Sequence, residues 1–186
     1  MARTPSAEAH EKVLEAATEL IAERGIETTS MDAIARLSGV SKATVYKHWK
    51  DKDALCVDVV RRLRVSPPEF RSGDLKRDLF SLLTHLAQAN KPVRLMKIMP
   101  RIIGYAAANP KFAEALKKNA MGPAELQILR ILDDGVAKGS LSADMDRDLV
   151  LNLLLGPIMH CRITRGMVPA KLPGYVVDGF WRSWGR

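Results

Sequence analysis

The chain has 186 residues, enough for one large domain or two small ones, and 47% of them are apolar, which argues against a wholly disordered protein. Its formal net charge of +8 favours a polyanionic partner such as nucleic acid. The charge does not by itself locate a binding face, because residues 1–65 hold 11 Lys and Arg against 10 Asp and Glu.

The first predicted element is a helix over residues 6–24. Its apolar side chains recur at helical spacing, and its glutamates keep to the other faces. Gly25 ends the helix, and Ile26 is placed to fold back onto its last turn. The helix carries no obvious ligand-contact chemistry, so its predicted role is to bury the back of the elements that follow.

Residues 29–55 predict two short helices joined by a tight turn. Either Thr29 or Ser30 can cap the first helix. Gly39 supplies the positive φ that a sharp helix exit needs, and Ser41 caps the second helix. The apolar face of the first helix is predicted to comprise Met31, Ile34, Ala35 and Leu37. Two helices joined in this way form a helix-turn-helix, whose second helix can enter the major groove of DNA.

A fourth helix is predicted over residues 54–64, after a cap at Asp51. The following Ser-Pro-Pro sequence breaks the helical pattern, because proline lacks an N–H donor and restricts the residue before it. We therefore expect a domain boundary at residues 65–73, between an N-terminal domain of residues 1–65 and a second domain of residues 74–186.

The second domain is predicted to be helical throughout, which makes the fold all-α. Pro100 is expected to kink or break one helix, and Gly122-Pro123 to kink or split a long helix over residues 109–138. Leu126 is among the side chains expected to face inward in that helix. Asp144 or Asp146 caps the next helix, and a last short helix is expected over residues 174–184.

The region around the helix-turn-helix resembles the DNA-binding domain of TetR-family transcriptional regulators. The match covers about residues 10–60 and depends on the order and spacing of Gly25, Thr28-Thr29-Ser30, Ile34-Ala35, Gly39-Val40-Ser41, Thr44-Val45-Tyr46-Lys47-His48-Trp49, Lys52 and Leu55. Two residues depart from the pattern: Ala43 stands where Gly is frequent, and Trp49 stands where Phe is commoner. The remainder of the chain resembles the family in layout, as a helical ligand-binding and dimerisation domain.

The resemblance and the residue chemistry together predict a DNA-contacting surface. Its members are Ser30, Ser41, Lys42, Ala43, Thr44, Tyr46, Lys47, His48 and Lys52. Tyr46 is expected to reach a phosphate or a base edge, whereas Lys42 and Lys47 are expected to neutralise phosphates more than to read bases. Val45 and Trp49 are assigned to the core. Between Arg36 and Lys52 the only acidic residue is Asp51, so this stretch is locally basic.

The family resemblance also implies a regulator that responds to a small-molecule effector. If the second domain encloses a cavity, the residues expected to line it are Phe80, Leu83, Met96, Met99, Tyr105 and Trp181. The leucine-rich helices around residues 123–138 and 146–165 are expected to form a homodimer as a four-helix bundle. Such a dimer would place two recognition helices on a palindromic operator of double-stranded DNA, as a repressor does.

Other classes of function find less support in the sequence. The four histidines show no metal-ligand spacing, and no Gly-rich phosphate loop or nucleophile motif is present. Helix capping explains the Asp144-x-Asp146-x-Asp148 run better than calcium binding does. We therefore expect no metal, no cofactor and no enzymatic activity. Sparse cysteines and the lack of a membrane-spanning apolar run suggest a cytoplasmic protein without a membrane partner. A small-molecule-binding or sequestering protein with a vestigial helix-turn-helix stays open as an alternative.

Overall fold

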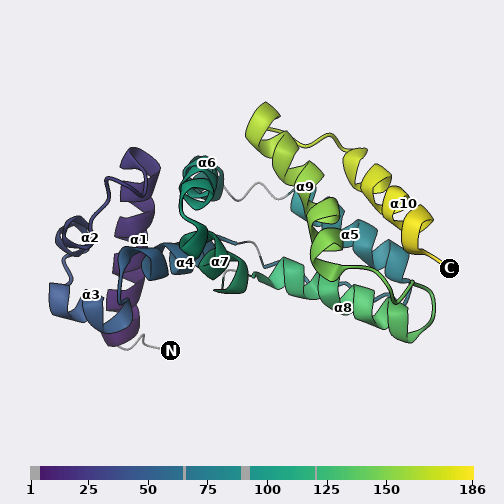
Figure 1. Cartoon of the computed structure of the whole chain (residues 1–186), viewed down its shortest axis with the longest axis horizontal. Coiled ribbons are helices and arrows are strands. Elements are labelled where there is room, and N and C mark those ends of the chain that lie inside the picture. The colour runs from purple at the N-terminus through teal and green to yellow at the C-terminus, as the bar shows by residue number, and fades with distance from the viewer. Residues whose placement is uncertain (1–4, 65, 89–92, 120) are drawn as a thin grey trace. The chain divides into compact units, whose positions relative to one another are not determined.

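The computed structural model describes residues 5–64, 66–88, 93–119 and 121–186, with side chains for all of these except residues 5–6 and 93–96. In these ranges the chain forms α-helices and no strand, apart from an isolated bridge between Leu141 and Gly185, so the predicted all-α fold is confirmed. The helices are labelled in Figure 1: α1 Pro5–Arg24, α2 Met31–Ser38, α3 Lys42–His48, α4 Lys52–Leu63, α5 Leu75–Gln88, α6 Val93–Ala108, α7 Pro110–Asn119, α8 Pro123–Ala137, α9 Arg147–Arg165 and α10 Leu172–Trp184. None of these helices is both long and apolar enough to cross a membrane.

The helices pack into two compact units, each around its own apolar core. Unit 1 joins Met1–Arg64 to Pro92–Met121, and unit 2 joins Val65–Lys91 to Gly122–Arg186. Unit 1 therefore contains α1 to α4 together with α6 and α7, and unit 2 contains α5, α8, α9 and α10. The sequence predicts two domains, residues 1–65 and residues 74–186, each expected to fold on its own. Compact units do not test independent folding, so this division stays a prediction.

The core of unit 1 is centred on α1, which packs against α2, α3, α4 and α6. Ile21 of α1 and Ile34 of α2 are fully buried there. Ile98 and Ile102 of α6 and Phe112 of α7 are buried in the same core, so the later pair of helices extends the core that the first four begin.

The start of the helix-turn-helix is set by hydrogen bonds at the α1–α2 turn. Gly25 has a φ of +86°, a left-handed conformation that favours glycine. Ser30 caps α2 by accepting the Ala33 N–H at 3.1 Å. Thr29 is buried instead and donates its hydroxyl to the Gly25 carbonyl at 2.6 Å. The structure therefore selects Ser30 as the cap, and the alternative at Thr29 was wrong.

Unit 2 is a bundle in which α5 contacts α8, α9 and α10. Leu82, Leu132 and Leu154 are fully buried between these helices. Asp146 caps α9 by accepting the Leu149 N–H at 3.0 Å, which settles the choice between the two predicted caps. The segment before α5 lies along α8, where the Gln127 side chain accepts the Phe70 N–H and donates to the Pro68 carbonyl.

Several details of the second half differ from the sequence prediction. Helix α6 continues through Pro100 without a break, and Pro100 itself is exposed. The long predicted helix is split into α7 and α8, which confirms one of the two outcomes expected at Gly122-Pro123, whereas α10 begins two residues earlier than expected. Leu126 is 56% exposed, so its inward assignment was wrong. The buried face of α8 is formed by Ile128, Ile131 and Leu132, which all lie on another side of the helix.

Leu37 was also wrongly assigned to the buried face of its helix. It is 48% exposed, whereas Met31, Ile34 and Ala35 are buried. At about 100° per residue, Leu37 lies roughly 110° around the helix from the centre of that face, too far to reach the core.

Candidate nucleic-acid interface

The two helices of the helix-turn-helix are joined by three residues, as the sequence predicts. Gly39 has φ 67° and ψ 14°, the left-handed conformation expected at a helix exit. Ser41 caps α3 by accepting the Thr44 N–H at 3.2 Å, and the hydroxyl groups of Ser41 and Thr44 lie 2.9 Å apart. Val40 packs partly against the core of unit 1 between the two helices.

Helix α3 has one buried face and one exposed face. Val45 and Trp49 are buried, which confirms their assignment to the core. The exposed side chains are Lys42, Ala43, Tyr46, Lys47 and His48, and Thr44 is half-buried. Tyr46 is 51% exposed, a high value for an aromatic side chain. The sequence therefore folds so that five of the six residues predicted to contact DNA from α3 are exposed, while Val45 points into the core.

Two predicted phosphate contacts are engaged in interactions within the protein. The Lys42 ammonium lies 2.6 Å from an Asp32 carboxylate oxygen, although both side chains are more than half exposed. The Lys52 ammonium donates to the Ile26 carbonyl at 2.6 Å and to the Glu27 carbonyl at 3.2 Å. Contact of either lysine with DNA stays a prediction, and for Lys42 it requires competition with Asp32.

The end of α3 is packed by aromatic rings. The His10 ring of α1 lies 4.6 Å from the Trp49 ring and 5.6 Å, nearly perpendicular, from the His48 ring. The indole N–H of Trp49 donates to an Asp58 carboxylate oxygen at 3.0 Å, and the other carboxylate oxygen lies 2.8 Å from Arg61. Sequence reasoning missed His10 and Asp58, because no local spacing connects either residue to Trp49.

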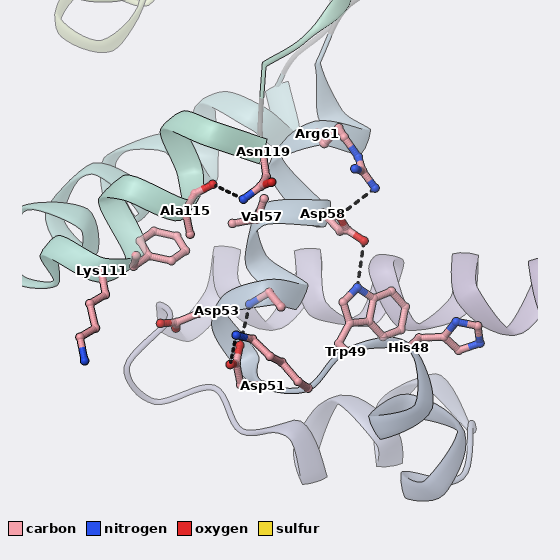
Figure 2. A pocket seen from close by; sticks show the side chains of 13 residues that line it. His48, Trp49, Asp51, Asp53, Val57, Asp58, Arg61, Lys111, Ala115 and Asn119 are labelled. Carbon is pink, nitrogen blue, oxygen red and sulfur yellow. Dashed lines mark hydrogen bonds and ion pairs between the residues drawn. The ribbon is translucent and has the colours of Figure 1, made fainter.

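A groove of about 480 Å³ lies beside this aromatic cluster, between the α3–α4 turn, α4 and α7 (Figure 2). Its ionic lining is balanced, with the acids Asp51, Asp53 and Asp58 and the bases Lys50, Arg61 and Lys111. The three carboxylates already accept hydrogen bonds from within the protein, respectively from Ala54 N–H, Tyr105 O–H and Trp49 N–H. The groove therefore has no net charge that would select an ionic ligand.

Tyr105 joins α6 to the start of α4 within unit 1. Its hydroxyl donates to Asp53 at 3.0 Å, its ring packs edge-on against Phe112, and the Lys52 ammonium lies 5.8 Å from the ring centre. Burial, reinforced by the bond to Asp53, raises the pKa of Tyr105 to about 12. Arg101, one turn earlier on α6, donates to the Glu23 carbonyl at the end of α1.

The residues predicted to line an effector cavity are divided between the two units. Tyr105 and the half-buried Met99 belong to unit 1, and the side chain of Met96 lies outside the described residues. In unit 2, Leu83 is fully buried, Trp181 packs partly against the core, and Phe80 is 43% exposed. Phe80 borders a groove of about 380 Å³ between α5 and α10, and a common cavity for all six residues stays a prediction.

Acidic and histidine side chains do not gather into a metal site in the part of the chain that the structure describes. Asp146 caps α9, and Asp144 accepts a hydrogen bond from Ser142, in keeping with capping and turn roles for this run.

A helix-turn-helix with an exposed, basic second helix, built on a helical core and followed by a second helical unit, defines a DNA-binding regulator. The family model described as bacterial regulatory proteins of the tetR family matches residues 13–59, and the tetracycline repressor-like C-terminal domain matches residues 71–179. The chain belongs to the TetR family and is a DNA-binding transcriptional regulator.

Individual relatives agree with this assignment. The HTH-type transcriptional regulator YdeS of Bacillus subtilis is 30% identical over 160 residues, which are 84% of this chain and 79% of that protein. The DNA-binding transcriptional repressor TetR of Mycobacteroides abscessus is 26% identical over 171 residues, 89% of this chain and 88% of that protein. Among solved structures, Salmonella enterica GusR has a similar fold, with a TM-score of 0.68, 20% identity and 96% of each chain covered.

Proposed function

We propose that the protein is an effector-responsive repressor that binds a palindromic operator as a homodimer. The observation that carries the DNA-reading part is the outward face of α3, where Lys42, Tyr46 and Lys47 are exposed while Val45 is buried in the core. A short helix held in this way presents its exposed side chains to the major groove. Since the partner is chromosomal DNA, we place the protein in the cytoplasm.

The predicted DNA-contacting side chains divide into base readers and phosphate contacts by their chemistry and placement. Ala43 and Thr44 carry methyl groups suited to contact with thymine methyls, and the Tyr46 phenol can bond to a base edge or a phosphate. Ser30, Ser41, Lys47, His48 and Lys52 offer hydrogen-bond donors to the backbone, which positions the protein but carries little sequence information.

Selection of bound sites from random double-stranded DNA tests this function directly. We expect a palindromic consensus whose half-sites lie about one helical turn apart, roughly 34–36 Å. Binding of a duplex with the selected site should be measured against a scrambled duplex of equal length at a stated salt concentration. Equal affinity for both duplexes would contradict sequence-specific regulation and favour a sequestering protein with a vestigial helix-turn-helix.

The homodimer is supported by apolar side chains that unit 2 leaves exposed. Leu126 of α8 is 56% exposed, and Leu149 and Leu153, one turn apart on α9, are 53% and 47% exposed. Apolar side chains gathered on one pair of helices mark a protein–protein contact more often than isolated ones do. We propose that α8 and α9, within the predicted ranges 123–138 and 146–165, pack against the same helices of a second copy.

Light scattering at micromolar concentration tests the dimer. The wild-type protein should have twice the chain mass, and Leu153→Glu should shift it toward the monomer because a charge cannot be buried unpaired in such a contact. Tyr175→Glu is a matched control, since Tyr175 is exposed on α10 rather than on α8 or α9. A monomeric wild-type protein, or dimers that resist the Leu153 change, would contradict the proposed interface.

We propose that the effector and the operator oppose each other through α6. The contacts from Tyr105 to Asp53 and from Arg101 to Glu23 connect α6 to α4 and α1. A ligand that displaces α6 therefore disturbs the helices that hold α3, and linkage requires the operator to weaken the ligand by the same factor. A compound that raises the thermal midpoint but leaves operator affinity unchanged would count against its role as the effector.

A further inference from the structure

We propose that Asp58 is a positioning residue for DNA recognition, which holds the end of α3 in place by accepting the indole N–H of Trp49. The proposal rests on the proposed function, in which α3 reads the operator. It names a residue of α4 whose side chain belongs to no predicted DNA contact and whose acidic charge would by itself oppose DNA binding.

Helix α3 depends on few anchors for its orientation. It has only seven residues, about two turns, so its own hydrogen bonds cannot hold it rigidly. The buried anchors are Val45 near its middle and Trp49 at its C-terminal cap, whose backbone N–H still bonds to the Val45 carbonyl. The position of the indole therefore decides how the last turn of α3, with Lys47 and His48, is directed.

The indole is fixed from two sides. Its N–H donates to Asp58 at 3.0 Å, and Figure 2 shows this bond, with Asp58 in turn facing Arg61. The His10 ring of α1 lies 4.6 Å from the indole at an interplanar angle of 32°. Trp49 is only 3% exposed, so water offers little replacement if the bond to Asp58 is lost.

Tryptophan at position 49 can form this contact because its indole ring carries an N–H donor. Phenylalanine at this position would fill the space by apolar packing but has no donor with which to select a ring orientation. A hydrogen bond to a carboxylate is directional and among the stronger ones in proteins. Trp49 and Asp58 together therefore define one ring orientation where a phenyl ring would permit several.

Two possible effects of Asp58, repulsion of DNA phosphates and positioning of α3, predict different changes in operator binding when its carboxylate is removed. A carboxylate near the DNA-binding helix repels phosphates, so its removal on charge grounds alone strengthens binding to every duplex. Loss of positioning instead weakens operator binding while leaving non-specific binding unchanged or stronger. The ratio of operator affinity to scrambled-duplex affinity separates the two explanations.

The experiment measures this ratio at one salt concentration for the wild type, Asp58→Leu, Asp58→Asn and Trp49→Phe. Asp58→Leu and Trp49→Phe should each lower the ratio about tenfold, in keeping with the loss of one hydrogen bond to a charged group. Asp58→Asn keeps an accepting carbonyl and should retain most of the ratio. The double variant Trp49→Phe/Asp58→Leu should also lose about tenfold, not a hundredfold, because both changes remove the same bond.

Glu19→Leu is the matched control, because it removes an exposed carboxylate from α1 of the same unit. It should leave the ratio unchanged. Thermal midpoints identify any variant that is not folded at the assay temperature. If Asp58→Leu is such a variant, Trp49→Phe, which removes the donor of the same bond, carries the test, and an undiminished ratio there overturns the proposal. An undiminished ratio in Asp58→Leu, or equal losses in Asp58→Leu and Asp58→Asn, would overturn the proposal.

Amide hydrogen exchange in the DNA-free protein keeps this proposal separate from the proposed function. Residues 42–49 should exchange about tenfold faster in Asp58→Leu than in the wild type, whereas Asp58→Asn and Glu19→Leu should not change them. If the wild type fails to distinguish the operator from scrambled DNA, the proposed function fails. Unchanged exchange in Asp58→Leu would show instead that Asp58 does not hold α3.

Discussion

Lys52 offers the sharpest test of the contacts that hold unit 1 together, the unit that contains the helix-turn-helix. Its ammonium bonds to the Ile26 and Glu27 carbonyls, at 2.6 and 3.2 Å, and thereby fastens the start of α4 to the α1–α2 turn. Lys52→Met keeps an unbranched apolar side chain but removes both bonds. The sequence predicts this lysine as a phosphate contact, whereas the structure gives it a place in the fold, and the two roles have different signatures.

The loss of stability can be worked from the two bonds. A buried hydrogen bond to a charged group contributes about 1.5–3 kcal/mol, and the bond to Ile26 is only half-buried, so about 1.5 kcal/mol is appropriate for it. The exposed bond to Glu27 adds about 0.5 kcal/mol. The change should therefore lower the free energy of unfolding by about 2 kcal/mol, which lowers the thermal midpoint of a 186-residue chain by about 4–8 °C.

Urea unfolding followed by circular dichroism measures this loss, with Lys47→Met as the control. Lys47 is exposed on α3, so its replacement should change stability by less than about 0.5 kcal/mol. The salt dependence of DNA binding reports the other role, because each lost phosphate contact lowers the log–log slope by about 0.9. If Lys52→Met is as stable as Lys47→Met, the ammonium does not hold the α1–α2 turn and the reasoning is refuted.

Three further predictions concern single side chains. Tyr46→Ala should weaken binding to all duplexes about five- to tenfold by the loss of one hydrogen bond, with stability unchanged by chemical denaturation; equal affinity in gel shifts would mean that another surface meets DNA. Asp32→Asn should release Lys42 from its ion pair and strengthen binding to scrambled DNA by up to about fivefold, because exposed ion pairs contribute little free energy. Anisotropy titrations measure this change, and weaker binding would contradict it. Burial, with smaller contributions from nearby carboxylates, raises the pKa of the Cys56 thiol from 9.0 to about 12. The thiol of the unfolded chain therefore ionises at lower pH than the thiol of the folded chain. The free energy of unfolding should fall by up to about 1.4 kcal/mol per pH unit above pH 9. Urea unfolding between pH 9 and 11 should show a shallower fall for Cys56→Ala, and identical pH profiles would argue against it.

Local features of the helix-turn-helix could be predicted because their causes lie close together in sequence. The left-handed Gly39, the cap at Ser41 and the buried Val45 each depend on residues within one or two turns. The outward face of α3 follows from these features by helical periodicity alone. Leu37 shows the limit of the same reasoning, since an apolar residue near the edge of a face can lie on either side of it.

Side-chain partners could not be predicted because they come from distant parts of the chain. Lys52 meets carbonyl groups 25 and 26 residues earlier, and Trp49 meets Asp58 across the α3–α4 turn. A lysine before a helix suggests a phosphate contact, and nothing in the local pattern distinguishes this from a structural bond. The interpretation of a candidate DNA contact such as Lys52 therefore changes once its neighbours in the fold are known.

Helix α6 shows why the packing matters for regulation. Its apolar periodicity indicates that one face is buried but not what covers that face, so the sequence leaves α6 with the second domain. In the structure Ile98 and Ile102 are fully buried in the core of unit 1, and Tyr105 bonds to α4. Because protein interiors are close-packed, α1 and α4 must repack when α6 shifts. The proposed displacement of α6 by an effector would therefore act on α1 and α4, the helices that hold α3.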